Sequence, residues 1–235
     1  MKEIKNMTKE IAQIYRKSGA EAKDYLRKAR KLEGLYGPAF ATIYCWFYSV
    51  PQKWTQVEPK IFELAEKTDF FGLDSILAIP TEKLTTILKP LIFRNEISLQ
   101  LKRFCRAVKS EYSSWGNFAN ALKKESIFMI FEKLKKYKNI RLTLKNLAAM
   151  KIFVGMDDDL IVLDIHVAKV LGINKIKRGK YVKQGKNFQT ILDFSREITD
   201  KLKKKKFNDA SMANWSLAIW FNKAKISAGR LLSSI

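Results

Sequence analysis

The chain has 235 residues, 47% of them hydrophobic, which is enough for one large domain or for two small lobes that share a cleft. No apolar run reaches the roughly 20 residues that span a bilayer, and the charged N-terminal segment lacks the apolar region of a secretory signal. Two cysteines and one histidine exclude a four-cysteine iron–sulfur cluster and the common four-ligand zinc sites. We therefore expect an intracellular protein with buried thiols at Cys45 and Cys105, no metal and no cofactor.

The net charge of +22 favours a polyanionic partner, because lysines that neutralise phosphates release counterions. A lysine-rich organism would contribute to the same excess. A basic membrane-surface protein is the less favoured reading, since the helical segments look core-forming rather than one-faced.

Helical periodicity dominates the chain and predicts the all-α class, with about ten short helices in one or two lobes. Gly34, Gly37–Pro38 and Pro51 are expected to interrupt the first segments. Only Ile161–Leu163 is ambiguous between strand and loop. The predicted helices span residues 2–32, 39–50, 58–67, 74–79, 81–88, 97–112, 118–122, 126–136, 144–153, 165–171, 190–206 and 211–232.

Three features follow one another in the middle of the chain. Pro80 opens a stretch that contains PLIFR at 90–94, a basic segment at 134–148 includes KNIRLTLK, and 163–172 reads LDIHVAKVLG. Their order resembles the helix-hairpin-helix DNA glycosylase superfamily over about residues 76–172. The likeness implies a compact two-lobed helical bundle with a helix-hairpin-helix element and a DNA-binding cleft between lobes. Residues 1–235 would form one such domain, with residues 39–130 in one lobe and 1–38 plus 131–235 in the other.

LDIHV is the most specific of the three features, and in the family this aspartate is the catalytic carboxylate. The resemblance thus assigns catalysis to Asp164 and a contact near the DNA backbone to His166. A fixed anion beside the sugar stabilises the positive charge that builds up when an N-glycosidic bond breaks. The simpler interpretation of Asp164 is a helix N-cap, and one carboxylate can fill both roles.

Lys145 is the candidate nucleophile, because it precedes Asp164 by 19 residues, the separation that the resemblance implies for glycosylases with lyase activity. It is predicted in the first turn of its helix, where burial and the helix N-terminus would lower its pKa. Members of the family usually carry glycines between the hairpin helices, and this chain has none there. Phosphate contacts are instead expected from Lys138, Asn139, Arg141 and Thr143, with Asn139 able to adopt a left-handed conformation.

A flipped base would stack against aromatic or apolar groups. Gln52 and Trp54, expected in a loop after Pro51, are candidates for this pocket. The resemblance adds Lys151 and the C-terminal Trp220, although core packing is an alternative for each tryptophan.

The leading hypothesis is a monomeric base-excision-repair enzyme that removes 8-oxoguanine from double-stranded DNA and cleaves the strand through a lysine Schiff base. A monofunctional glycosylase for alkylated bases or uracil is the first alternative; in it, Thr143 would stand at the lysine position and Asp164 would activate water. A non-catalytic helical DNA-binding protein, with Asp164 only a cap, is the second.

Overall fold

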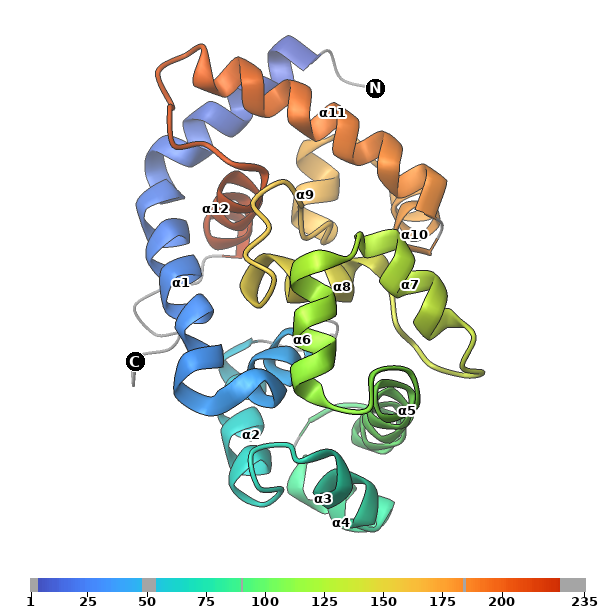
Figure 1. Cartoon of the computed structure of the whole chain (residues 1–235). Coiled ribbons are helices and arrows are strands. Elements are labelled where there is room, and N and C mark those ends of the chain that lie inside the picture. Colours follow the sequence, from blue (N-terminus) through green and yellow to red (C-terminus); the bar gives the residue numbers. More distant parts are fainter. Residues whose placement is uncertain (1–3, 48–53, 90, 184, 225–235) are drawn as a thin grey trace.

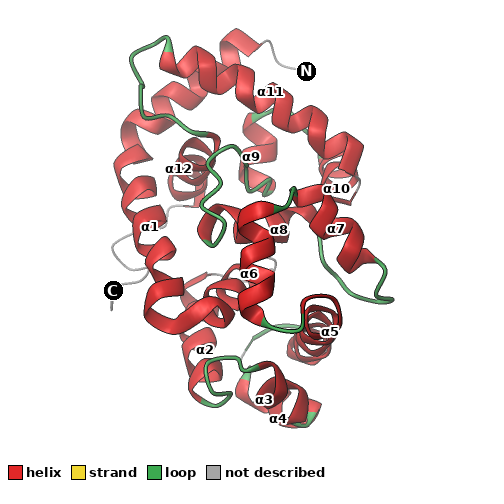
Figure 2. Cartoon of the chain, in the orientation of Figure 1, coloured by secondary structure: helices red, strands yellow, loops and turns green. Residues whose placement is uncertain are grey.

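The computed structural model describes residues 4–47, 54–89, 91–183 and 185–224, and this part of the chain is helical, without strands (Figures 1 and 2). The expected all-α class is therefore confirmed, and Ile161–Leu163 forms an extended loop. The described residues form twelve helices: α1 (Ile4–Trp46), α2 (Trp54–Glu66), α3 (Leu73–Ala78), α4 (Thr81–Ile87), α5 (Arg94–Tyr112), α6 (Trp115–Lys124), α7 (Ile127–Lys135), α8 (Leu144–Phe153), α9 (Ile165–Val170), α10 (Lys175–Lys183), α11 (Gly185–Lys203) and α12 (Met212–Ala224).

Helix α1 runs along one side of the molecule, from the level of α11 down to α2 (Figure 1). It was expected to break at Gly34 and at Gly37–Pro38. Gly34 is helical, and only Gly37 leaves the helical region, with φ 85° and ψ 168°. Pro38 follows this kink, so the chain changes direction where the sequence predicts the boundary between two lobes.

Several helices begin at residues whose side chains accept a hydrogen bond from the first turn. Ser114, Ser126, Thr143 and Asp164 start α6, α7, α8 and α9 in this way. The capped ends fix where α8 and α9 begin, and the candidate catalytic residues lie at these two starts.

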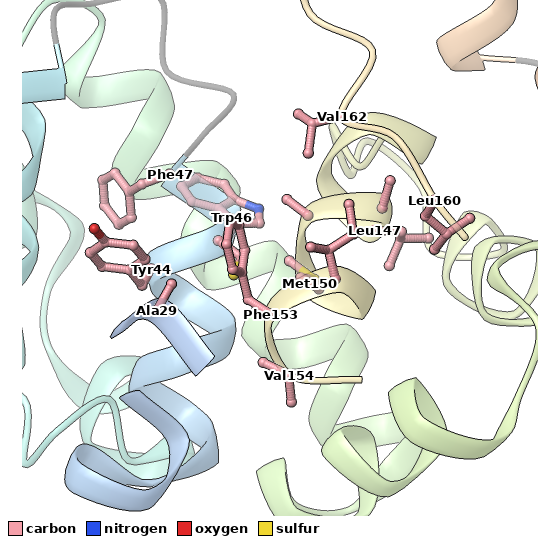
Figure 3. Close-up of a cluster of buried hydrophobic side chains, with 14 of the residues drawn as sticks. Ala29, Tyr44, Trp46, Phe47, Leu147, Met150, Phe153, Val154, Leu160 and Val162 are labelled. Carbon is pink, nitrogen blue, oxygen red and sulfur yellow. The ribbon is translucent and has the colours of Figure 1, made fainter. Parts of the chain in front are cut away.

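One cluster of the hydrophobic core lies between α1, α8 and the segment that follows α8 (Figure 3). Trp46, Phe47 and Phe153 lie there with Leu160, and all four are almost fully buried. Both cysteines are also buried and unpaired, as expected. Burial raises the pKa of the Cys45 thiol well above its ordinary value.

Helix α10 was not expected from the sequence. Its residues KIKRGKYVK have a mostly polar composition and only Val182 is buried, so apolar periodicity does not reveal it. It packs against α8, α9 and α11. No helix in the described ranges combines the length and apolar composition needed to cross a bilayer.

Candidate active site

Asp164 is the N-cap of α9, which confirms the simpler of its two expected roles. Its Oδ1 accepts a hydrogen bond of 2.7 Å from the Val167 N–H, and the residue is only 9% exposed. The segment before it, Leu160–Leu163, is buried and carries the chain through the core to this position. The carboxylate is therefore held in one orientation at the start of a helix.

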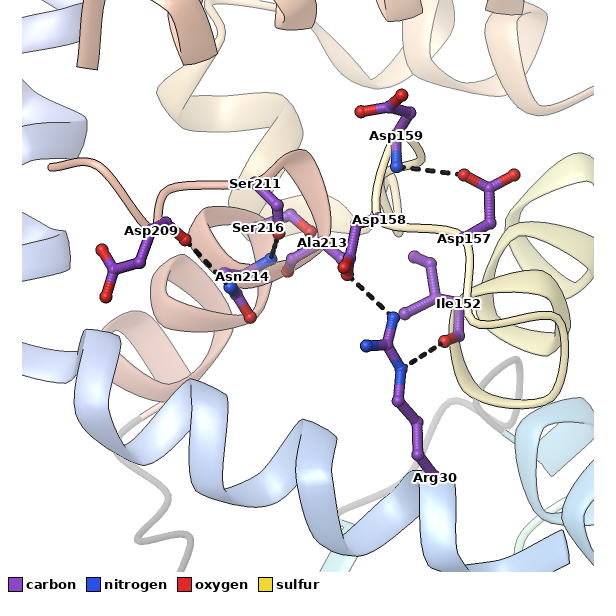
Figure 4. Close-up of polar contacts among 10 residues, drawn as sticks. All are labelled: Arg30, Ile152, Asp157, Asp158, Asp159, Asp209, Ser211, Ala213, Asn214 and Ser216. Carbon is purple, nitrogen blue, oxygen red and sulfur yellow. Dashed lines mark hydrogen bonds and ion pairs between the residues drawn. The ribbon is translucent and has the colours of Figure 1, made fainter. Parts of the chain in front are cut away.

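The loop between α8 and Asp164 is tied to two other helices (Figure 4). Arg30 of α1 donates from Nε to the Ile152 carbonyl at 3.1 Å and from Nη2 to Asp158 Oδ1 at 2.8 Å. The Ala213 N–H of α12 donates to the Asp158 carbonyl at 3.2 Å. These bonds fix the loop that sets the spacing between the start of α8 and the start of α9.

Lys145 lies in the first turn of α8, as predicted, and its residue is partly buried. Burial is the main cause that lowers the pKa of its amine; the Arg178 guanidinium also lowers it, and the Asp164 carboxylate opposes both. Lys145 and Asp164 are thus within electrostatic reach of each other, although 19 residues separate them in the chain. A buried amine with a lowered pKa is a better nucleophile near neutral pH than an ordinary lysine.

The first turn of α8 is anchored on both sides of Lys145. Thr143 and Asn146 form a reciprocal capping box, and the Asn146 side chain donates to the Trp46 carbonyl at 3.0 Å. The end of α1 therefore lies beside the start of α8. The proposed pocket residue Gln52, which follows α1 in the sequence, lies outside the described residues.

Arg178 of α10 is a charged neighbour of Lys145 that the sequence did not reveal. Its Nε is buried without a hydrogen-bond partner in the described part of the chain. The only sequence signal was its place among the basic residues of 175–183, and that pattern does not separate one buried arginine from exposed lysines.

The loop between α7 and α8 places Lys138, Asn139 and Arg141 on the surface. Asn139 has the predicted left-handed conformation, with φ 63°. Helix α5 fastens this loop: Arg103 donates to the Asn139 carbonyl at 3.1 Å, and Gln100 Oε1 accepts the Arg141 N–H at 2.7 Å. The Arg141 N–H is therefore occupied, and the Arg141 guanidinium lies 3.4 Å from Glu96 Oε1.

The Thr143 hydroxyl is used within the protein. Its Oγ1 donates to Asn146 Oδ1 at 2.7 Å as part of the cap of α8. His166 lies in the first turn of α9, where it is partly exposed. The two residues are both partly exposed, but the Thr143 hydroxyl is already used by the cap.

The other residues predicted for the base pocket are held by the protein itself. Trp54 is the first residue of α2 rather than a loop residue, and it is buried edge-on against Tyr44 at 5.2 Å between ring centroids. The expected loop position was wrong because α2 begins four residues before the predicted start. Trp220 is partly buried and packs on Phe221 and Tyr25 at the edge of the core.

Lys151 is buried, and its ammonium donates to the carbonyls of Leu122 and Glu125, each at 2.7 Å. These carbonyls lie at the end of α6, so Lys151 closes that helix. Burial lowers the pKa of Lys151, with Asp157 and Glu125 opposing the change. Its contacts explain its burial without a base in the pocket.

Neither a cluster of metal ligands nor the pocket described next includes Lys145 or Asp164. No group of three or more metal-ligating side chains is found in the described ranges. A shallow pocket lies instead near the Arg30 end of the α8–α9 loop, and it is lined by Arg30, Lys31, Glu33, Gly34, Leu35 and Met156. No known protein family, curated protein or solved structure matches the chain.

Proposed function

We propose that the protein is a DNA glycosylase with lyase activity, in which Lys145 is the nucleophile and Asp164 the stabilising carboxylate. The observation that carries this proposal is the pairing of a buried amine of lowered pKa with a fixed, capped carboxylate across α8 and α9. The caps of α8 and α9 involve no contact between Lys145 and Asp164, so the fold does not require this pairing. A titratable group with a perturbed pKa near an opposite charge is typical of functional sites.

In the proposed reaction, the neutral Lys145 amine attacks C1′ of the damaged nucleotide while the N-glycosidic bond breaks and the base leaves with the bonding electron pair. Positive charge builds on the sugar during this step, and the Asp164 carboxylate stabilises it. Asp164 then accepts a proton from the attacking amine. Ring opening gives a Schiff base between Lys145 and the sugar. Loss of a C2′ proton and of the 3′-phosphate then cuts the strand.

Duplex DNA is the proposed partner. The charge of +22 and the exposed Lys138 and Arg141 would supply phosphate contacts beside the site. In this proposal α7, its loop and α8 form the helix-hairpin-helix element, and the damaged base enters a cleft between lobes. The proposed substrate is an oxidised purine, 8-oxoguanine.

The monofunctional alternative has one observation in its favour. The Asp164 charge stabilises the protonated, non-nucleophilic form of Lys145. If this effect outweighs burial on the bound substrate, Asp164 would instead activate water and no Schiff base would form.

The test is a panel of duplexes that each carry one lesion, incubated with and without borohydride. The proposal predicts release of 8-oxoguanine and a borohydride-stable adduct that Lys145→Gln abolishes. Lys169→Gln, an exposed lysine on α9, is the matched control and should keep the adduct. Base release without an adduct would support the monofunctional alternative, and an adduct that persists in Lys145→Gln would contradict Lys145 as nucleophile. Release of no base from any duplex would contradict the glycosylase proposal itself.

A further inference from the structure

The position of Arg178 is unusual for an arginine that only supports the fold. Helix α10 packs against α8, whose first turn carries Lys145, and against α9, which Asp164 caps. The Arg178 Nε is buried and finds no acceptor among the described residues. Buried donors without a protein partner are uncommon in native proteins, and some of them serve to bind an ion or a ligand.

The charges of α10 restrict what such a ligand can be. The helix contains Lys175, Lys177, Lys180 and Lys183 besides Arg178, and no acidic residue. These lysines are exposed, whereas Arg178 is partly buried. A planar guanidinium with unused donors recognises carboxylate or phosphate with two parallel hydrogen bonds. On a strongly basic chain, phosphate is the better match.

We infer that Arg178 is a positioning residue of the Lys145–Asp164 site, where it binds a phosphate of the DNA strand next to the excised nucleotide. This inference rests on the proposed function. A phosphate held there would fix the sugar relative to Lys145. The exposed lysines of α10 would contact DNA without regard to the lesion.

The charged groups around Lys145 allow a check in the free protein. Asp164 and Arg178 both act on its amine, in opposite directions. Arg30 of α1 lies at the other end of α8, at Ile152. Glu125, between α6 and α7, also lies near that end, at Lys151. Removing the Arg178 charge should therefore raise the pKa of Lys145 and move its modification by an amine reagent to higher pH.

The experiment compares Arg178→Gln, Arg178→Lys and the exposed neighbour Lys177→Gln. Binding is measured on two duplexes, one undamaged and one with a tetrahydrofuran abasic analogue. Arg178→Gln should weaken binding to the abasic duplex about tenfold or more, and binding to the undamaged duplex much less. The affinity of Arg178→Lys for the abasic duplex should lie between those of Arg178→Gln and the wild type. Lysine keeps the positive charge but cannot form the two parallel hydrogen bonds of a guanidinium. Lys177→Gln should weaken both duplexes equally and reduce the salt slope by about one phosphate.

Two results would overturn the inference: an Arg178→Gln variant that loses no more affinity than Lys177→Gln, or one that loses affinity equally on both duplexes. Thermal melting and the labelling profile of Lys145 show whether the variant keeps its fold and whether Arg178 faces the amine. Failure of the proposed function has a different signature, since wild-type protein would then form no borohydride adduct on an abasic duplex and would not prefer that duplex. That outcome would overturn the inference as well.

Discussion

Single residues at the site differ in how far the sequence could predict them. The LDIHV segment predicted both the N-cap and the fixed carboxylate of Asp164, because a cap depends on neighbours three residues away. Lys151 was assigned to a base pocket, yet its acceptors are carbonyls 29 and 26 residues earlier in the chain. Periodicity does not reveal such partners, because they are set by how α6 packs near α8.

The structural role of Lys151 can be tested by substitution. Lys151→Met should lower the free energy of unfolding by about 1–3 kcal/mol, because two buried carbonyls lose their donor. Base release per folded molecule should stay unchanged. Lys124→Met, at an exposed position of α6, is the control and should leave stability nearly unaltered. Denaturant unfolding and single-turnover assays give the two measurements; a stable Lys151→Met protein with impaired base release would restore the pocket assignment.

At the scale of elements, apolar periodicity located most helices, and the aspartate of LDIHV located the start of α9. Periodicity did not predict α10, because this helix is mostly basic and has no row of apolar residues along one face. The α7–α8 loop was predicted with its left-handed Asn139, because asparagine tolerates that conformation. Its attachment to α5 through Gln100 and Arg103 could not be predicted, since those contacts join segments 36 or more residues apart.

The exposed basic side chains of this loop give an element-scale prediction. Lys138→Ala and Arg141→Ala should each weaken binding to any duplex and reduce the log–log salt slope by about one. Lys9→Ala removes the same charge from an exposed position on α1 and should leave the slope unchanged. Fluorescence anisotropy over a range of salt concentrations measures the slopes. Equal slopes for all three variants would mean that this loop does not lie on DNA.

For the whole molecule, the all-α class could be predicted, while the arrangement of the helices came only with the structure. Helix α1 runs from the level of α11 to α2 and packs against α8 and α12, so it links the start of the chain to the helix that carries Lys145 (Figure 1). Its kink at Gly37 sets how the two parts of α1 are oriented. The sequence located that kink because Pro38 disfavours a continuous helix and because Gly37, just before it, readily adopts a positive φ.

Two glycines of α1 provide a matched pair for this idea. Gly37→Ala should lower the free energy of unfolding by about 1–3 kcal/mol, because φ 85° and ψ 168° suit glycine almost alone. Gly34→Ala should raise it by about 0.5–1 kcal/mol, since Gly34 is helical and an added methyl meets no atom within 4 Å. Chemical denaturation measures both, and a Gly37→Ala protein as stable as the wild type would contradict the kink as a requirement of the fold.

The most direct test of the central claim separates the charge of Asp164 from its cap. Asparagine caps a helix about as well as aspartate, so Asp164→Asn should fold and bind DNA normally. Asp164→Ala loses the cap too and should be less stable by about 1 kcal/mol. The measurement is the single-turnover rate of base release at saturating enzyme. We predict that Asp164→Asn lowers this rate at least about 100-fold, and an Asp164→Asn protein that releases the base at the wild-type rate would show that Asp164 is only a helix cap.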